Sequence, residues 1–178
     1  FMKSLWRSFF ITLVLIFSTL SASAEILRFV QVDQTIFRGS QPENKMDYDR
    51  LQELGVKYVF NLRDDYREIQ WEKQELDKRG IVLMSYPMSP WDKPNPRTIK
   101  QMLLQIQQAS QLGGVYIHCH HGKDRTGIVM GLYRIHFQGW DRMKAYSEMA
   151  SLGFNHIFWD MQDFFWKYSL PRAFDKVQ

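Results

Sequence analysis

The 178-residue sequence contains very little cysteine, since Cys119 is the only one. A single cysteine excludes a scaffold held together by internal disulfides. The sequence also lacks a strong excess of charge, because 23 Lys and Arg residues face 19 Asp and Glu residues. Nucleic-acid-binding domains usually carry a basic stripe, so we expect no nucleic-acid partner. With 45% hydrophobic and 15% aromatic residues, the chain does not have the composition of a disordered protein.

The N-terminal segment has the pattern of a targeting signal. Lys3 and Arg7 precede twelve uncharged residues, Phe9–Leu20, which are followed by small residues that end in an Ala-x-Ala pattern at Ala24. This order predicts that residues 1–24 are a secretory signal peptide that is cleaved after Ala24. The alternative is a retained membrane anchor, although twelve residues are short of the about 20 that a span needs. We therefore expect an exported bacterial protein, most simply periplasmic, without a membrane span after cleavage.

Residues 25–178 are expected to form one domain of alternating strands and helices. Strands are predicted over residues 26–30, 36–37, 56–62, 81–86 and 115–119. Helices are predicted over residues 44–54, 68–78, 98–112, 126–138, 142–151 and 156–168. This alternation predicts an α/β fold with a central, mainly parallel sheet flanked by helices. In such folds, ligands bind at the carboxyl ends of the strands.

The segment 115–127, VYIHCHHGKDRTG, carries residues suited to phosphate chemistry. It follows an apolar strand and leads directly into a helix, where free backbone N–H groups and the helix dipole attract anions. These groups also favour the thiolate form of Cys119. The guanidinium of Arg125, six residues later, can hold two oxygens of a tetrahedral anion. The pattern predicts transfer of a phosphoryl group to the sulfur of Cys119.

The same segment resembles the signature of the cysteine-dependent protein tyrosine phosphatase superfamily, Cys-x5-Arg-[Ser/Thr]. The wider sequence is similar to small bacterial dual-specificity-type phosphatases over most of residues 26–168. The segments that carry this wider similarity are Phe37–Pro42, Leu54–Val56 with Asn61–Arg63, Tyr133–Ile135 and Gln138–Trp140. The resemblance implies a tyrosine phosphatase-like fold and no metal or organic cofactor.

The resemblance also implies a role for each residue of the loop. Cys119 is expected to be the nucleophile that forms a phosphocysteine, and Arg125 to bind the phosphate and the transition state. Thr126 is expected to donate its hydroxyl to the leaving Cys119 thiolate, and His118 to fix the loop by hydrogen bonding. The residues expected to bind substrate are His120, His121, Gly122, Lys123, Asp124 and Arg125.

The general acid that protonates the leaving oxygen has two candidates. Asp92 lies in the segment 87–96, which holds four prolines in ten residues and is therefore expected to be a loop. Asp124 lies inside the phosphate loop and could instead cap the following helix. The leaving oxygen points out of the cradle, so the acid should approach from a facing loop, which favours Asp92.

Several other side chains have structural interpretations that compete with functional ones. His118, Cys119, His120 and His121 could form a metal cluster, but consecutive positions rarely converge on one ion. Lys123 could be a solvated lysine or a second phosphate contact, with neither favoured. Arg38 and Arg63 are expected to form structural ion pairs, with positioning of the loop or the substrate as the alternative. The remaining expectations are structural: a solvated turn for Asp64 and Asp65, and core packing for Phe154, Ile157, Phe158, Met161, Phe164 and Phe165.

These observations predict an enzyme that hydrolyses phosphotyrosine or phosphoserine/threonine, so its partner would be a phosphorylated protein or a small phosphomonoester. The alternative is a phosphoinositide or inositol polyphosphate phosphatase, because the loop residues 122–126 also resemble those of bacterial lipid and inositol phosphatases. Lys93, Arg97 and Lys123 could then contact the additional phosphates. A phosphate-binding module without turnover is a third reading, which the presence of both Cys119 and Arg125 argues against.

Overall fold

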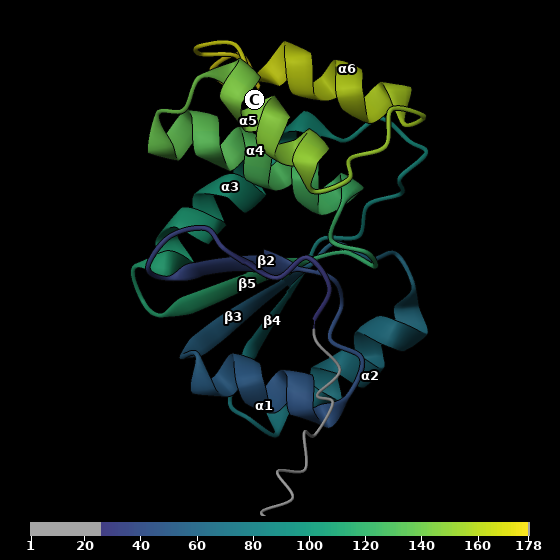
Figure 1. Cartoon of the computed structure of the whole chain (residues 1–178), viewed down its shortest axis with the longest axis vertical. Helices are drawn as coiled ribbons and strands as arrows, with labels where there is room; N and C mark the ends of the chain where they lie inside the picture. The colour runs from purple at the N-terminus through teal and green to yellow at the C-terminus, as the bar shows by residue number, and fades with distance from the viewer. Residues whose placement is uncertain (1–25, 178) are drawn as a thin grey trace, which may run out of the picture.

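A computed structural model describes residues 26–177 as a five-stranded sheet with helices on both faces (Figure 1). The expected signal peptide, residues 1–24, lies outside the described residues. The strands are β1 (Val30–Gln31), β2 (Ile36–Gly39), β3 (Val56–Asn61), β4 (Val82–Ser85) and β5 (Gly114–His118). The helices are α1 (Lys45–Glu53), α2 (Tyr66–Asp77), α3 (Pro96–Ser110), α4 (Asp124–Gln138), α5 (Arg142–Ser151) and α6 (Trp159–Tyr168).

The strand order is β1-β2-β5-β3-β4, and the expected α/β fold with a mainly parallel sheet is confirmed. Strands β2, β5, β3 and β4 run parallel, and only β1 is antiparallel to its neighbour β2. Helices α1 and α2 cover one face of the sheet, while α3 to α6 lie on the other (Figure 1). The carboxyl ends of the four parallel strands therefore meet at one edge, which is where a ligand site is expected.

Capping residues explain why two helices begin earlier than the sequence pattern predicts. Helix α2 begins at Tyr66 rather than residue 68, because the side chain of Asp65 accepts hydrogen bonds from the backbone N–H groups of the first turn. Helix α3 begins at Pro96 rather than residue 98, with Asn95 as its N-cap. Proline suits the first helical position because a backbone N–H there would have no acceptor within the helix, so its absence costs nothing. Asp65, expected to be part of a solvated turn, is thus a helix cap.

The predicted strand over residues 26–30 is wrong for most of its length. Residues 27 and 28 form a turn, with Arg28 at a positive φ of 54°, and the strand is confined to Val30–Gln31. The carbonyl of Leu27 accepts a hydrogen bond from the backbone N–H of Ser40. This turn brings Arg28 toward the loop after β5, where it contacts the site described below.

Strand β5 and helix α4 form the centre of the domain. Every residue of β5 is buried, and so is each residue of α4 from Arg125 to Arg134. A side chain at Gly131 would lie 2.5 Å from the sulfur of Met149 on α5 and 3.0 Å from Phe165 on α6, so glycine lets these helices pack closely. Because both elements are held on all sides, the loop between them has fixed ends.

The aromatic stripe near the C-terminus packs in the core, as expected. Phe154, Met161, Phe164 and Phe165 are buried in the larger hydrophobic cluster of the domain, whereas Ile157 is exposed. Among the residues that the structure describes, we find no helix with the length and apolar content that crossing a membrane requires.

Candidate active site

Cys119 follows the last residue of β5, at the bottom of the loop that joins this strand to α4. Its side chain is buried, with the residue only 3% exposed. The loop passes through Gly122 at a positive φ of 70° and reaches the first residue of α4, Asp124. A Cβ at Gly122 would lie 2.4 Å from the backbone of Gly39, so both the conformation and the close approach require glycine. The loop therefore curls tightly against the end of β2.

Arg38 of β2 supports this loop from behind. The residue is fully buried, and its Nη2 donates a hydrogen bond of 2.8 Å to the carbonyl of Gly122. Burial lowers the pKa of Arg38 to about 10, so the guanidinium is still charged at neutral pH. The expected ion pair of Arg38 is wrong, and the alternative, that Arg38 positions the loop, agrees with its hydrogen bond to the backbone of Gly122.

His118, the residue before the cysteine, fixes the loop from the sheet. Its Nδ1 lies 3.2 Å from the carbonyl oxygen of Cys119, and because a carbonyl only accepts, this nitrogen is the donor. Its Nε2 lies 3.0 Å from a carboxylate oxygen of Glu72, an ion-pair distance when the imidazole is protonated. Both side chains are fully buried. No sequence pattern pointed to Glu72, which lies on α2, far from the motif in sequence.

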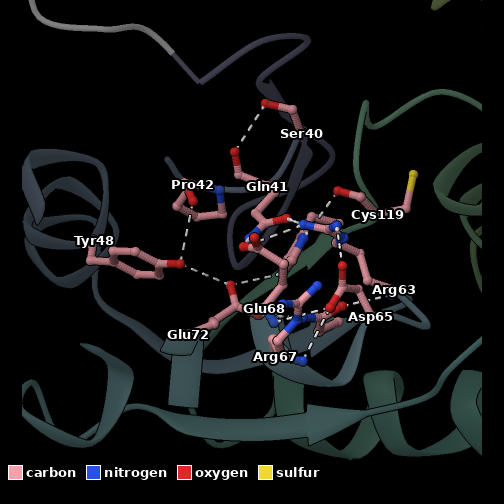
Figure 2. A network of polar contacts seen from close by, with 12 residues as sticks. Ser40, Gln41, Pro42, Tyr48, Arg63, Asp65, Arg67, Glu68, Glu72 and Cys119 are labelled. Carbon is pink, nitrogen blue, oxygen red and sulfur yellow. Dashed lines mark hydrogen bonds and ion pairs between the residues drawn. The ribbon is translucent and has the colours of Figure 1, made fainter. Parts of the chain in front are cut away.

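Glu72 joins three elements beneath the site (Figure 2). Its carboxylate accepts hydrogen bonds from the hydroxyl of Tyr48 on α1, at 3.3 Å, and from the side-chain amide of Asn61 at the end of β3. Desolvation by burial and the nearby charge of Glu72 raise the pKa of Tyr48, which keeps its hydroxyl a donor. A buried carboxylate is stable only when its oxygens are satisfied, so these donors are needed if Glu72 is to remain beside His118.

Arg125, on the first turn of α4, lies across the end of β3. Its Nη1 donates to the carbonyls of Leu62 (3.3 Å) and Met88 (2.9 Å), and forms an ion pair of 3.0 Å with Asp64. Asp64 was expected to lie in a solvated turn; it is half-exposed, but its carboxylate positions Arg125. Among residues 26–177, Nε and Nη2 of Arg125 have no partner. One edge of the guanidinium is therefore available for two oxygens of an anion.

The other residues of the motif differ in exposure. The hydroxyl of Thr126 is buried and pairs with no group in the part of the chain that the structure describes. His120 and His121 are exposed, with ring centroids 4.1 Å apart, as expected for residues at a pocket mouth. Burial, together with the charges of His121, Arg63 and Arg125, lowers the pKa of His120, so that its imidazole is neutral at neutral pH.

The two candidate acids have different surroundings. The carboxylate of Asp124 accepts a hydrogen bond of 2.8 Å from the backbone N–H of Asn155, in the connection between α5 and α6. Asp92 is exposed and lines a cavity of about 210 Å³ whose described lining comes from its own loop and the start of α3. This loop begins beside the site, since Met88 contacts Arg125, and Trp91 packs edge-on against Phe158 at 4.9 Å.

The three basic residues suggested as contacts for additional phosphates have separate surroundings. Lys93 lines the same cavity as Asp92, whereas Arg97 borders a different hollow with Lys100. Lys123 lies against Gly153, where a Cβ would come 3.1 Å from Lys123 Cδ and 3.8 Å from Arg28 Nε. Arg28, which no sequence pattern singled out, also donates a hydrogen bond to the carbonyl of His121.

Arg63 has the structural role expected of it. Its guanidinium contacts the side-chain oxygen of Gln41 and lies 3.6–3.7 Å from the carboxylates of Glu68 and Asp65 (Figure 2). Gln41 in turn donates to Glu68 at 3.2 Å, and its backbone N–H donates to the carbonyl of His120. These contacts connect the phosphate loop to the start of α2.

Comparison with known proteins agrees with this geometry. A model of the tyrosine phosphatase family matches residues 24–176. The dual specificity protein phosphatase TpbA of Pseudomonas aeruginosa is 33% identical over 129 residues, which cover 72% of this chain and 56% of TpbA. An inositol diphosphatase of Arabidopsis thaliana is 30% identical over 112 residues, covering 61% of this chain and 55% of the relative. The chain thus spans slightly more than half the length of these curated relatives.

The solved structures show the same fold. A crystal structure of a cysteine-to-serine variant of TpbA in complex with phosphotyrosine has a TM-score of 0.67, at 28% sequence identity. The similarity covers 78% of this chain and 83% of that one.

Proposed function

Because the chain belongs to the tyrosine phosphatase family, we propose that it hydrolyses phosphate monoesters, with phosphotyrosine as the preferred class, through a phosphocysteine on Cys119. The relative TpbA is named a dual specificity protein phosphatase, and a variant of it has been crystallised with phosphotyrosine. These names describe relatives that share only part of their length with this chain, so the activity is inferred from the site itself.

The observation that carries the proposal is a buried Cys119 at the end of β5, followed on the first turn of α4 by an Arg125 whose guanidinium is already held in place. Nη1 is held by Asp64 and by the carbonyls of Leu62 and Met88, so the guanidinium is positioned before any substrate binds. The free edge of the fork and the N–H groups at the start of α4 suit a phosphate dianion. Such preorganised donors stabilise charge on a transferring phosphoryl group at little reorganisation cost.

The reaction has two steps. In the first, the Cys119 thiolate attacks phosphorus, the S–P bond forms, the P–O bond to the leaving group breaks, and a carboxylic acid protonates the leaving oxygen. In the second, the resulting carboxylate takes a proton from water, whose oxygen attacks phosphorus. The S–P bond then breaks, which releases inorganic phosphate and restores the thiolate. The buried hydroxyl of Thr126 is suited to stabilise that thiolate as it leaves.

We assign the acid to Asp92. The carboxylate of Asp124 is engaged with the backbone of Asn155, a structural contact. The suggestion that it caps the following helix is wrong, because Asp124 is the first residue of α4 and the N-cap position, Lys123, makes no side-chain cap. Met88 at the start of the Asp92 loop contacts Arg125, and the side chain of Asp92 is exposed, so Asp92 is near the phosphate site and open to a substrate. Apo geometry need not show the catalytic hydrogen bond, since such contacts often form only with substrate bound.

An inositol polyphosphate is the second candidate substrate, because one relative is an inositol diphosphatase. Arg28 and Lys123, which border Gly153, offer two positive charges beside the loop. A phosphate-binding module without turnover is the third candidate. It is disfavoured because Cys119 and Arg125 are both present.

Turnover of an aryl phosphate tests the proposal directly. Purified protein should hydrolyse nitrophenyl phosphate with or without a chelator, and Cys119→Ser should lower kcat by about 10⁴-fold or more, since removing a nucleophile has effects of this size. Cys119→Ser should still bind phosphate or vanadate, because Arg125 and the backbone N–H groups remain. Substantial activity in Cys119→Ser would exclude the phosphocysteine mechanism.

We also propose that the domain comprises residues 25–178 and is exported to the periplasm after cleavage at Ala24. The supporting observation is the Ala-x-Ala pattern behind a short apolar run. Intact-mass measurement of the protein from a periplasmic extract should give a chain that begins at Glu25. Recovery in the membrane fraction with residues 1–24 retained would instead indicate an anchor.

A further inference from the structure

A second cavity lies beside the phosphate loop and plays no part in the mechanism above. Its volume is about 230 Å³, and its lining residues are Gln41, Pro42, Glu43, Arg63, Glu68, Trp71 and His120. His120 is the residue after the nucleophile, so this cavity adjoins the mouth of the phosphate site. A group bound here would belong to the same substrate molecule as the phosphate.

The cavity has a net negative charge. Its only arginine, Arg63, already lies between the carboxylates of Glu68 and Asp65 and contacts Gln41. Glu43 is exposed, and its carboxylate has no ion-pair partner among residues 26–177. His120 adds no positive charge at neutral pH, because its pKa is lowered. The carboxylate of Glu43 is therefore the uncompensated charge at this edge of the site.

The side chain of Trp71 forms a wall of the cavity that suits a cationic group. This side chain is 38% exposed and packs edge-on against the buried Tyr48 at 5.7 Å, which fixes its ring. An indole face attracts ammonium and guanidinium groups. A fixed indole and a free carboxylate in one cavity are complementary to a cationic side chain and would repel an additional phosphate.

On this basis, which rests on the proposed phosphatase function, we propose that the cavity beside His120 binds a lysine or arginine side chain adjacent to the phosphotyrosine of a peptide substrate. Arg28 donates a hydrogen bond to the carbonyl of His121, the next residue of the loop, and Lys123 lies near Arg28 at Gly153. The loop thus has a negatively charged flank at His120 and a positively charged flank at His121, which would orient an extended peptide. An inositol polyphosphate is anionic all round, so any orientation brings a phosphate toward Glu43.

The test compares kcat/KM for short phosphotyrosine peptides that carry Lys, Ala or Glu at each position from three before to three after the phosphotyrosine. At one position or more, Lys should be favoured over Ala by about two- to fivefold, the size expected of a solvent-exposed ion pair, and Glu should be disfavoured. Glu43→Gln should bring the Lys-to-Ala ratio to about one, and Glu43→Lys should invert it. Added salt should weaken the preference, because exposed charges are screened.

Glu53→Gln is the matched control, because Glu53 is an exposed glutamate at the far end of α1. It should keep both the nitrophenyl phosphate activity and the lysine preference of the unmodified protein. A lysine preference that persists in Glu43→Gln, or no preference at all in an active enzyme, would overturn the inference. So would an inositol pyrophosphate turned over faster than every peptide. If the unmodified protein showed no Cys119-dependent turnover of nitrophenyl phosphate, the proposed function would instead be refuted.

Discussion

The base and the rim of the phosphate loop are built in different ways. The base consists of Arg38, Glu72 and His118, all fully buried, and each contacts the loop or a residue that does. The rim consists of side chains such as Glu43, His121 and Asp92, which are exposed. Changes at the base disturb buried charges and hydrogen bonds, whereas exposed charges change energies by about 1 kcal/mol or less. We therefore expect the base to determine reactivity and the rim to determine selectivity.

Asp92 is the residue that would break this division, because it lies on the rim but is assigned a catalytic role. Asp92→Asn should slow an alkyl phosphate by about 10²–10⁴-fold, the usual contribution of general acid catalysis, and nitrophenyl phosphate much less. The difference arises because a good leaving group needs little protonation. The variant should also lose the high-pH limb of the kcat/KM profile.

Asp124→Asn is the matched control for that prediction. It removes the charge that accepts the backbone N–H of Asn155, so we expect lower stability without leaving-group dependence. If Asp124→Asn shows both kinetic effects and Asp92→Asn shows neither, the acid lies within the phosphate loop and the assignment is wrong.

Arg125→Lys tests the most constrained donor of the site. Lysine keeps the charge but cannot pair with Asp64 and present a two-donor edge to phosphate at the same time. We expect kcat/KM for nitrophenyl phosphate to fall by about 10²–10³-fold, as when a transition-state donor is removed. Full activity in Arg125→Lys would mean that the edge of the guanidinium does not contact the transferring group.

Arg38→Met isolates the buried charge behind the loop. It removes the donor to the Gly122 carbonyl and a buried positive charge. We expect kcat/KM to fall about tenfold, in line with the worth of a hydrogen bond from a charged group.

Stability is measured beside activity for Arg38→Met. The substitution leaves the buried carbonyl of Gly122 without its donor, which costs about 1–3 kcal/mol, so the thermal midpoint should fall while the protein still folds. Full activity in folded Arg38→Met would mean that the hydrogen bond to Gly122 does not shape the loop for catalysis.

The residues of the base show what the sequence could and could not reveal. Cys119, Arg125 and the strand–loop–helix around them are contiguous, so the local pattern predicted the fold of this segment and the chemistry suited to it. Glu72 and Asp64 come from other elements, and their contacts with His118 and Arg125 exist only after α2 and β3 pack against β5. No local pattern distinguishes a buried glutamate on an amphipathic helix from an exposed one.

Local rules predict some of the ends of the strands and helices, but not all of them. The alternation of strands and helices gave the sheet and its mainly parallel order, but the antiparallel β1 and the turn at Arg28 depend on a pairing with β2. The caps at Asp65 and Asn95 follow known preferences and could have corrected two helix starts. The charge of the cavity beside His120 could not be predicted, because its lining comes from three separate segments.

Lys123 gives the smallest expected effect and the sharpest test of where the base ends and the rim begins. Its stem borders Gly153 beside Arg28, so its ammonium is available to an anion at the mouth but is not fixed by a buried partner. Lys123→Gln should therefore lower kcat/KM for nitrophenyl phosphate by about twofold, and for a substrate with a second phosphate by up to about fivefold, both within the range of exposed ion pairs.

Lys93→Gln, on the proline-rich loop, is the matched control and should lack the dependence on a second phosphate. The lysine preference of peptide substrates should be unchanged in Lys123→Gln, because that preference depends on Glu43 on the other flank. A loss of tenfold or more with nitrophenyl phosphate would instead show that Lys123 contacts the transferring phosphate, as Arg125 is proposed to do, and Lys123 would then not belong to the rim.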